Sequence, residues 1–208
     1  MLTGIYRLTT GNIRLDGQEM VGLKPYQFAQ HGITRTFQNI RLFSNATVAD
    51  NVKMAYTMHN KENLLKCFLR TRGMVENERR LDERVMELLD RLGIADKADL
   101  LAKNLSYGEQ RRLEIARAMA SEPQLLLLDE PAAGMNSTEK VELTEMIRKI
   151  RDAGITILLV EHDMKLVMRV TDRIAVLNFG KMIALDEPEA IQNNPEVIAA
   201  YLGGGINA

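Results

Sequence analysis

Hydrophobic positions along the chain follow two patterns, a helical repeat and unbroken aliphatic runs. Across residues 76–93 the apolar positions recur at helical spacing, and Gly93 stands where such a helix would stop. The inward face of this helix is predicted to comprise Leu81, Val85, Leu88, Leu89 and Leu92. Two unbroken aliphatic runs, 125–128 and 157–160, are too short to cross a bilayer. They predict buried strands over 124–129 and 155–160.

Capping residues mark where other helices begin. Ser106-x-x-Glu109 is a capping box that predicts a helix through Ala120, and Asn136-x-x-Glu139 predicts a helix that ends at Gly154. The inward face of the second of these helices is predicted to comprise Val141, Ile147 and Ile150. Shorter elements are predicted as a strand over 11–17 that ends in a turn, a strand from 33, a hairpin over 172–185, and helices over 25–31, 46–58, 164–170 and after Pro188 and Pro195.

The order of these elements predicts an α/β fold. Strand, helix, strand and helix follow one another from residue 124 onward, which indicates a parallel sheet with crossover helices. Residues 76–120 contain no predicted strand, so we expect them to form a helical lobe attached to that sheet.

Composition narrows the class of protein. Of the 208 residues, 46% are hydrophobic and 26% are charged, and the net charge is −1. This balance is typical of a soluble globular protein, and it creates no general attraction for nucleic acid. The first residues lack a basic start followed by an apolar core, and the single cysteine, Cys67, fits a reducing compartment. We therefore expect a soluble, cytosolic chain.

Two acids follow the first buried strand directly. Asp129 and Glu130 end the run LLLLDE, and His162 follows the next strand. Because ligands of a parallel sheet bind at the carboxyl ends of its strands, these side chains are expected to share one edge. There an Asp can hold Mg²⁺ and a neighbouring Glu can polarise a water. The alternative for a single acid in this position is that it caps the next helix.

The helix that opens at Ser106 offers a second possible site. Ser106 and Gly108 would present backbone N–H groups at the positive end of the helix dipole, which suits phosphate oxygens. An ordinary capped helix with no ligand explains the capping box equally well.

Four motifs in order identify a family resemblance. LSYGEQRR resembles the signature motif of ABC-type ATPases, and LLLLDEP resembles their Walker B strand. TRTFQNIRLF is similar to their Q-loop, VEHDM to their H-loop, and AGMNS to their D-loop, with Asn136 where many relatives carry Asp. The chain also resembles the ATPase subunit of branched-chain amino-acid importers over essentially its whole length. This closer resemblance rests on the exact residues of these motifs and of the tail from TDRIAVLNFGK to AAYLGG.

The resemblance implies a P-loop NTPase-like fold of the ABC ATPase type. It divides the chain into a part of the catalytic core with the Q-loop (1–45), a helical lobe ending in the signature motif (46–120), the core with Walker B, D-loop and H-loop (121–185), and a C-terminal helical tail (186–208). The implied partners are a second ATPase subunit, identical or not, transmembrane permease subunits and, indirectly, a substrate-binding protein. The implied location is the cytoplasmic face of the membrane, without nucleic acid.

The resemblance also assigns roles to residues, with ATP and Mg²⁺ as the cofactors. Asp129 and Gln38 would hold Mg²⁺, Glu130 would act as general base, and His162 would contact the γ-phosphate. Gln38 would also report to the membrane domains. The nucleotide held by the opposite subunit would be served by Ser106, Gly108 and Glu109, and Asn136 of the D-loop would also bind nucleotide.

One family motif is not present in these 208 residues. No glycine opens a G-x-x-x-x-G-K-[ST] sequence, whose backbone amides and lysine cradle phosphates in this superfamily. In relatives, a segment like LTGIYRLTTGNIRLDG follows that loop. We therefore expect that the P-loop and first strands either precede Met1 or are missing, that ATP binding by this chain is impaired, and that an apolar sheet edge is exposed.

Three alternatives to a transport ATPase stay open at this point. The chain could be a non-catalytic protein that docks on a complete partner, a DNA-repair or translation ATPase of the same superfamily, or a fragment of a damaged gene. The transported substrate is also open, with urea or amides beside branched-chain amino acids. Residues 61–73 could form an amphipathic helix at a membrane surface, although a solvated helix on the lobe fits equally.

Overall fold

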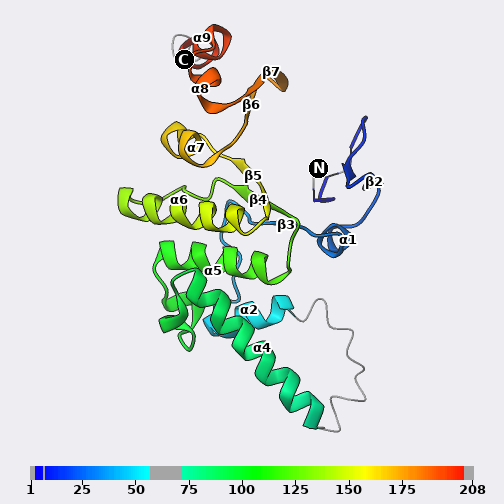
Figure 1. The fold of residues 1–208 in the computed structure, drawn as a ribbon, viewed down its shortest axis with the longest axis vertical. Coiled ribbons are helices and arrows are strands. Elements are labelled where there is room, and N and C mark those ends of the chain that lie inside the picture. The colour runs from blue at the N-terminus through cyan, green and yellow to red at the C-terminus, as the bar shows by residue number, and fades with distance from the viewer. Residues whose placement is uncertain (1–2, 7, 57–71, 204–208) are drawn as a thin grey trace.

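A computed structural model of the chain describes residues 3–6, 8–56 and 72–203. At its centre lies a three-stranded sheet in the order β3-β4-β5 (Figure 1), formed by Ile33–Arg35, Leu125–Asp129 and Thr156–Val160. All three strands run parallel, and Asp129 at the end of β4 lies opposite Val160 at the end of β5. The predicted parallel sheet is therefore confirmed, and the carboxyl ends of its strands share one edge.

Strand β4 is covered on both faces, which explains its unbroken apolar run. Leu126 and Leu128 are almost fully buried in a large core that includes residues of α2, α4, α5 and α6. Leu127 points into a smaller cluster with Met20, Phe28 and Ile33. A strand with one solvent-exposed face would instead alternate between buried and exposed side chains. Strand β5 shows such alternation, and its Leu158 and Val160 are exposed.

The predicted helical lobe comprises α2 (Val48–Tyr56), α4 (Arg72–Arg91), η2 (Ala95–Lys97), η3 (Ala102–Asn104) and α5 (Tyr107–Ala120). It occupies one end of the long axis of the molecule (Figure 1). The predicted inward face of the helix over 76–93 is confirmed, because Val85, Leu88, Leu89 and Leu92 are buried and Leu81 is partly buried against the same core. Most of the amphipathic segment predicted over 61–73 lies outside the described residues.

Helices α6 (Ser137–Asp152) and α7 (Met164–Val170) follow β4 and β5 in the predicted order. Ile147 and Ile150 of α6 are buried as expected, but Val141 is 52% exposed, so its predicted inward position is wrong. The buried stripe of α6 instead includes Leu143 and Met146, which share a helical face with Ile147 and Ile150 at three- and four-residue spacing.

The remaining elements lie at the ends of the described chain. The C-terminal part forms the predicted hairpin, β6 (Ile174–Asn178) and β7 (Lys181–Asp186), followed by α8 (Pro188–Gln192) and α9 (Pro195–Gly203). The strand predicted over 11–17 is shorter than expected, as β1 (Arg14–Leu15), and it pairs with β2 (Gln18–Glu19) in a tight hairpin that precedes α1 (Pro25–Gln30). Asp16 and Gly17 both have positive φ, so the turn predicted at the end of this strand is confirmed. No described helix combines the length and apolar composition that crossing a membrane requires.

Candidate active site

The acid pair lies at the carboxyl edge of the sheet. Asp129 is the last residue of β4, and the backbone N–H of Glu130 donates to the carbonyl oxygen of Val160 at 2.9 Å. Glu130 has a φ of +45°, a left-handed conformation that is unfavourable for a residue with a side chain. Such strain persists only where the surroundings hold it, and it is concentrated at functional sites.

Two segments far apart in the chain converge on Glu130. The side-chain amide nitrogen of Gln38, in the loop after β3, donates to Glu130 Oε2 at 2.9 Å. His162 Nδ1, after β5, lies 3.8 Å from Glu130 Oε1, and its imidazole is 77% exposed. The predicted convergence of strand ends therefore holds for Asp129, Glu130 and His162, and Gln38 joins them at the same edge.

Asp129 forms an ion pair with Arg35 in this structure. Its carboxylate pairs with the guanidinium of Arg35 at 2.5 Å, and both side chains are 28% exposed. The sequence interpretation missed Arg35, although a basic residue three positions before Gln38 on a predicted strand was a usable signal.

The acid edge also fits a magnesium ion. The carboxylate of Asp129 and the amide oxygen of Gln38 are the oxygen ligands that Mg²⁺ prefers. Within the described residues, no cluster of three or more His, Cys, Asp or Glu side chains could hold a metal by itself. Few protein ligands are typical of Mg²⁺ bound together with substrate phosphates.

The other predicted site residues gather at the starts of α5 and α6. Ser106 Oγ accepts from the backbone N–H of Glu109, whose carboxylate accepts from the N–H of Ser106 at 2.8 Å. Asn136 caps α6 in the same way, accepting from the N–H of Glu139 at 3.0 Å. A Cβ atom on Gly108 would lie 2.8 Å from the Glu139 carboxylate, so the first turn of α5 packs closely against the start of α6. Both predicted capping boxes are thus confirmed.

Residues next to His162 tie the H-loop to the rest of the edge. Glu161 Oε1 accepts from the backbone N–H of Ala132 at 2.9 Å, which joins the loop after β5 to the loop after β4. Asp163 caps α7 and pairs with Lys140 Nζ at 2.7 Å. The hydrogen bond from Lys140 holds the pKa of the Asp163 carboxyl below its usual value. The sequence pattern predicted this supporting role for neither Glu161 nor Asp163.

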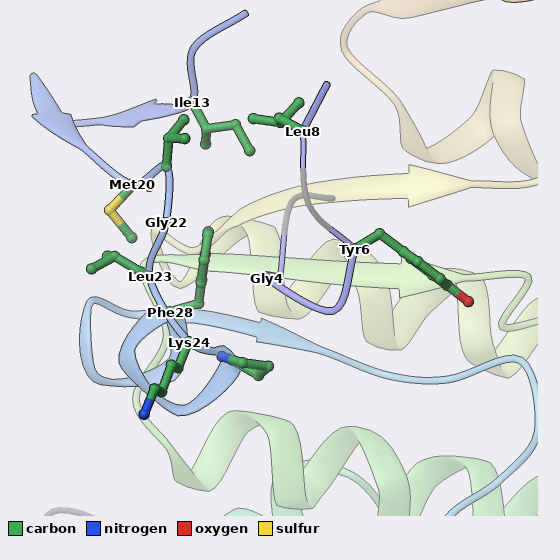
Figure 2. Close-up of a pocket in the computed structure, with 11 residues that line it drawn as sticks. Gly4, Tyr6, Leu8, Ile13, Met20, Gly22, Leu23, Lys24 and Phe28 are labelled. Atoms are coloured by element: carbon green, nitrogen blue, oxygen red, sulfur yellow. The ribbon is translucent and has the colours of Figure 1, made fainter. Parts of the chain in front are cut away.

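The surface of the described residues has several hollows, and one of them lies at this edge. A hollow of about 200 Å³ adjoins Asp129 and Arg35, with Leu158 and Val160 in its wall. A cavity of about 450 Å³ lies between the N-terminal segment and α1. Figure 2 shows the side chains that line it, most of them apolar, such as Met20 and Phe28. Among the described residues, none of the predicted site residues lines this second cavity. The acid edge is therefore the better candidate for chemistry.

Comparison with known proteins shows which family the chain matches. Residues 1–133 match the ABC transporter family, and residues 181–206 match the family described as "Branched-chain amino acid ATP-binding cassette transporter". The chain is 47% identical over 203 residues to LivG of Escherichia coli K12, covering 97% of this chain and 80% of LivG. It is 45% identical over 203 residues to BraF of Pseudomonas aeruginosa, with the same coverage. Both are named high-affinity branched-chain amino acid transport ATP-binding proteins.

Solved structures agree with the fold. An ATP-binding cassette of an ABC transporter in its ADP conformation superposes with a TM-score of 0.79 at 24% identity, covering 97% of this chain and 80% of that one. A nucleotide-free ATP-binding cassette also superposes with a TM-score of 0.79, at 25% identity and with 96% and 80% coverage. The predicted fold class is thereby confirmed as an α/β fold of the P-loop NTPase type.

The chain belongs to the ABC transporter family, as the quoted motifs predict. As a member it is an ABC-type, nucleotide-binding ATPase subunit. Three points stay predictions. These are the roles of individual residues toward the nucleotide, the bound metal, and the finer division of the chain into domains.

Proposed function

We propose that this chain is the ATP-hydrolysing subunit of an importer for branched-chain amino acids or similar small amides. It would act at the cytoplasmic face of the membrane, as part of a pair of ATPase subunits that drives transmembrane permease subunits. The observation that carries the proposal is the contact of Gln38 with Glu130 beside Asp129 at the sheet edge. The names of LivG and BraF support the substrate class.

Each residue at the acid edge has a distinct role in this proposal. Glu130 takes the proton of the attacking water as general base. Asp129 and Gln38 would hold Mg²⁺, which would neutralise charge on the transferred phosphate. The exposed imidazole of His162 would contact the terminal phosphate. Asp129 would be available to the metal once its ion pair with Arg35 opens.

The residues at the starts of α5 and α6 serve a second nucleotide in this proposal. Ser106, Gly108 and Glu109 lie in the first turn of α5, where backbone N–H groups and the helix dipole favour an anion. Asn136 caps the neighbouring helix α6. A second ATPase subunit would bring its own nucleotide to this surface, which leaves the acid edge to the nucleotide of this subunit.

The P-loop contacts to phosphate have no source in these 208 residues. The sequence contains no G-x-x-x-x-G-K-[ST] motif, so the acid pair would face anionic phosphates without a lysine and without the loop amides. We therefore expect these residues alone to bind and hydrolyse ATP poorly. This absence also supports a second candidate, a non-catalytic chain that docks on a complete partner.

The test compares the 208-residue chain alone with the same chain fused behind the P-loop segment of E. coli LivG. The fusion should hydrolyse ATP at least about 10-fold faster than the chain alone, and Glu130→Gln in the fusion should reduce the rate by about 10² to 10⁴-fold. Binding of a fluorescent ATP analogue should be unchanged by Glu130→Gln. Undiminished hydrolysis in that variant would sink the general-base assignment.

Other outcomes separate the two candidates and test the substrate. A fusion that binds ATP but never hydrolyses it would favour the non-catalytic docking protein. Vesicles with the permease subunits and binding protein of the same system should take up leucine only when ATP and the fusion are present. Uptake of urea but not of leucine would reject the branched-chain amino-acid assignment while keeping the ATPase.

A further inference from the structure

An arginine in the signature helix is completely buried. Arg111 of α5 is 0% exposed at its side chain, and it pairs with Glu114 at 2.7 Å, whose side chain is only 6% exposed. Its Nε atom is buried without a hydrogen-bond partner among the described residues. A buried ion pair gains little stability over apolar residues of the same volume, because both charges lose their water. The pair is therefore expected to have a use other than stability.

The pair binds the backbone that carries Gln38. Arg111 Nη1 donates to the carbonyl oxygen of Phe37 at 2.7 Å, and Arg111 Nη2 donates to the carbonyl oxygen of Gln38 at 3.0 Å. Glu114 Oε1 accepts from the backbone N–H of Phe37 at 3.2 Å. Three backbone groups of two successive residues are thus held by two side chains of one helix.

These contacts begin where the sheet ends. The N–H of Thr36 still donates to the carbonyl oxygen of Leu127 in β4, at 3.0 Å. The next N–H, that of Phe37, turns away from β4 and donates to Glu114 instead. The backbone therefore passes from the sheet to α5 one residue before Gln38, whose side chain then reaches Glu130.

We propose that Arg111 and Glu114 are positioning residues, which hold residues 37 and 38 so that the Gln38 amide stays within hydrogen-bond distance of Glu130. This inference rests on the proposed function, because its catalytic consequence requires Glu130 to act on ATP. Arg111 also donates to the Tyr107 hydroxyl at 3.2 Å, in the first turn of α5. The start of the signature helix is thereby joined to the acid edge through a single guanidinium.

The geometry requires an arginine. The planar guanidinium directs two nitrogen atoms at two successive carbonyl oxygens and at Glu114 together, whereas a lysine offers one nitrogen on a flexible chain. Arg111→Lys should therefore keep the charge and lose the position of Gln38. Glu114→Gln keeps an acceptor for the N–H of Phe37, so it should have the weaker effect.

The first measurement is hydrogen exchange on the 208-residue chain, which needs no ATPase activity. Arg111→Met and Arg111→Lys should each speed exchange of residues 36–42 by about 10-fold, with residues 125–129 unchanged. Arg79→Met is the matched control, because Arg79 forms an i,i+3 pair with Glu76 on α4 at 3.0 Å but is 63% exposed. It should leave exchange of residues 36–42 at the wild-type rate.

The second measurement is a double-mutant cycle in the ATP-hydrolysing fusion. Gln38→Ala and Arg111→Lys should each lower kcat by about 10-fold, and the double variant should be no slower than Gln38→Ala alone, because both changes remove the same contact. A merely structural Arg111 would lower kcat further in the double variant.

The two measurements keep this inference apart from the proposed function. A fusion without ATPase activity would reject the proposed function, while exchange in residues 36–42 would still decide whether Arg111 holds this segment. Unchanged exchange in both Arg111 variants, or additive losses of kcat, would overturn the positioning role.

Discussion

Two arginine–carboxylate pairs in this protein have nearly the same geometry and opposite surroundings. Arg35 and Asp129 approach to 2.5 Å at the sheet edge, with both side chains 28% exposed. Arg111 and Glu114 approach to 2.7 Å with side chains 0% and 6% exposed. Water can replace either partner of the first pair at little cost, whereas each charge of the second depends on the other. The edge pair is suited to exchange its cation, and the buried pair is suited to hold a position.

Removing one partner of each pair would sharpen this contrast most. Glu114→Ala leaves the Arg111 charge buried and unpaired, so the free energy of unfolding should fall by about 3–5 kcal/mol. Arg35→Met should lower it by only about 1 kcal/mol or less, because Asp129 is partly solvated. Urea titration of the 208-residue chain measures both values.

The double change Arg111→Met with Glu114→Leu serves as the control for this prediction. It replaces the buried pair by apolar residues of similar size, so most of the lost stability should return. Equal losses for Glu114→Ala and Arg35→Met would contradict the contrast between the two pairs.

The same contrast explains what could be predicted from the sequence. Asp129, Glu130 and His162 directly follow apolar runs, so a parallel sheet was enough to bring them to one edge. The capping boxes at Ser106 and Asn136 were equally local, because both partners lie within three residues. Features of this kind depend on short spacing, which a single sequence displays.

The buried pair could not be predicted in this way. Arg111 stands in a polar run, QRR, and arginine is rarely fully buried, so an exposed position was the natural expectation. Its backbone partners at 37 and 38 are more than 70 positions away, and no periodicity joins them. Val141 was misplaced for a related reason, since a few apolar residues on a helix are compatible with more than one inward face.

A pair of glycines allows a finer test of the packing around the buried pair. Gly134 has a φ of +76° and Gly180 a φ of +77°, so alanine meets the same backbone strain at both. A Cβ on Gly134 would lie 3.3 Å from the Tyr107 ring, whereas nothing lies within 4 Å of one on Gly180. Gly134→Ala should therefore lose about 1 kcal/mol more than Gly180→Ala in thermal or urea unfolding. Equal losses would mean that Tyr107 moves aside freely.

The smallest expected effect concerns a third ion pair, Asp163 with Lys140, beside His162. Because Lys140 lowers the pKa of the folded Asp163, the charged form contributes stability that is fully present above the unfolded pKa of about 4 and is lost as pH falls through the lowered pKa. Asp163→Asn keeps an acceptor for the cap of α7 and removes the charge. The free energy of unfolding of the wild type should exceed that of this variant by about 0.5 kcal/mol at pH 6, and the difference should shrink as pH falls through the lowered pKa of Asp163. A difference that stays constant from pH 6 to pH 2.5 would show that Asp163 acts only as a cap, and that this pair, unlike Arg111 with Glu114, has no electrostatic part.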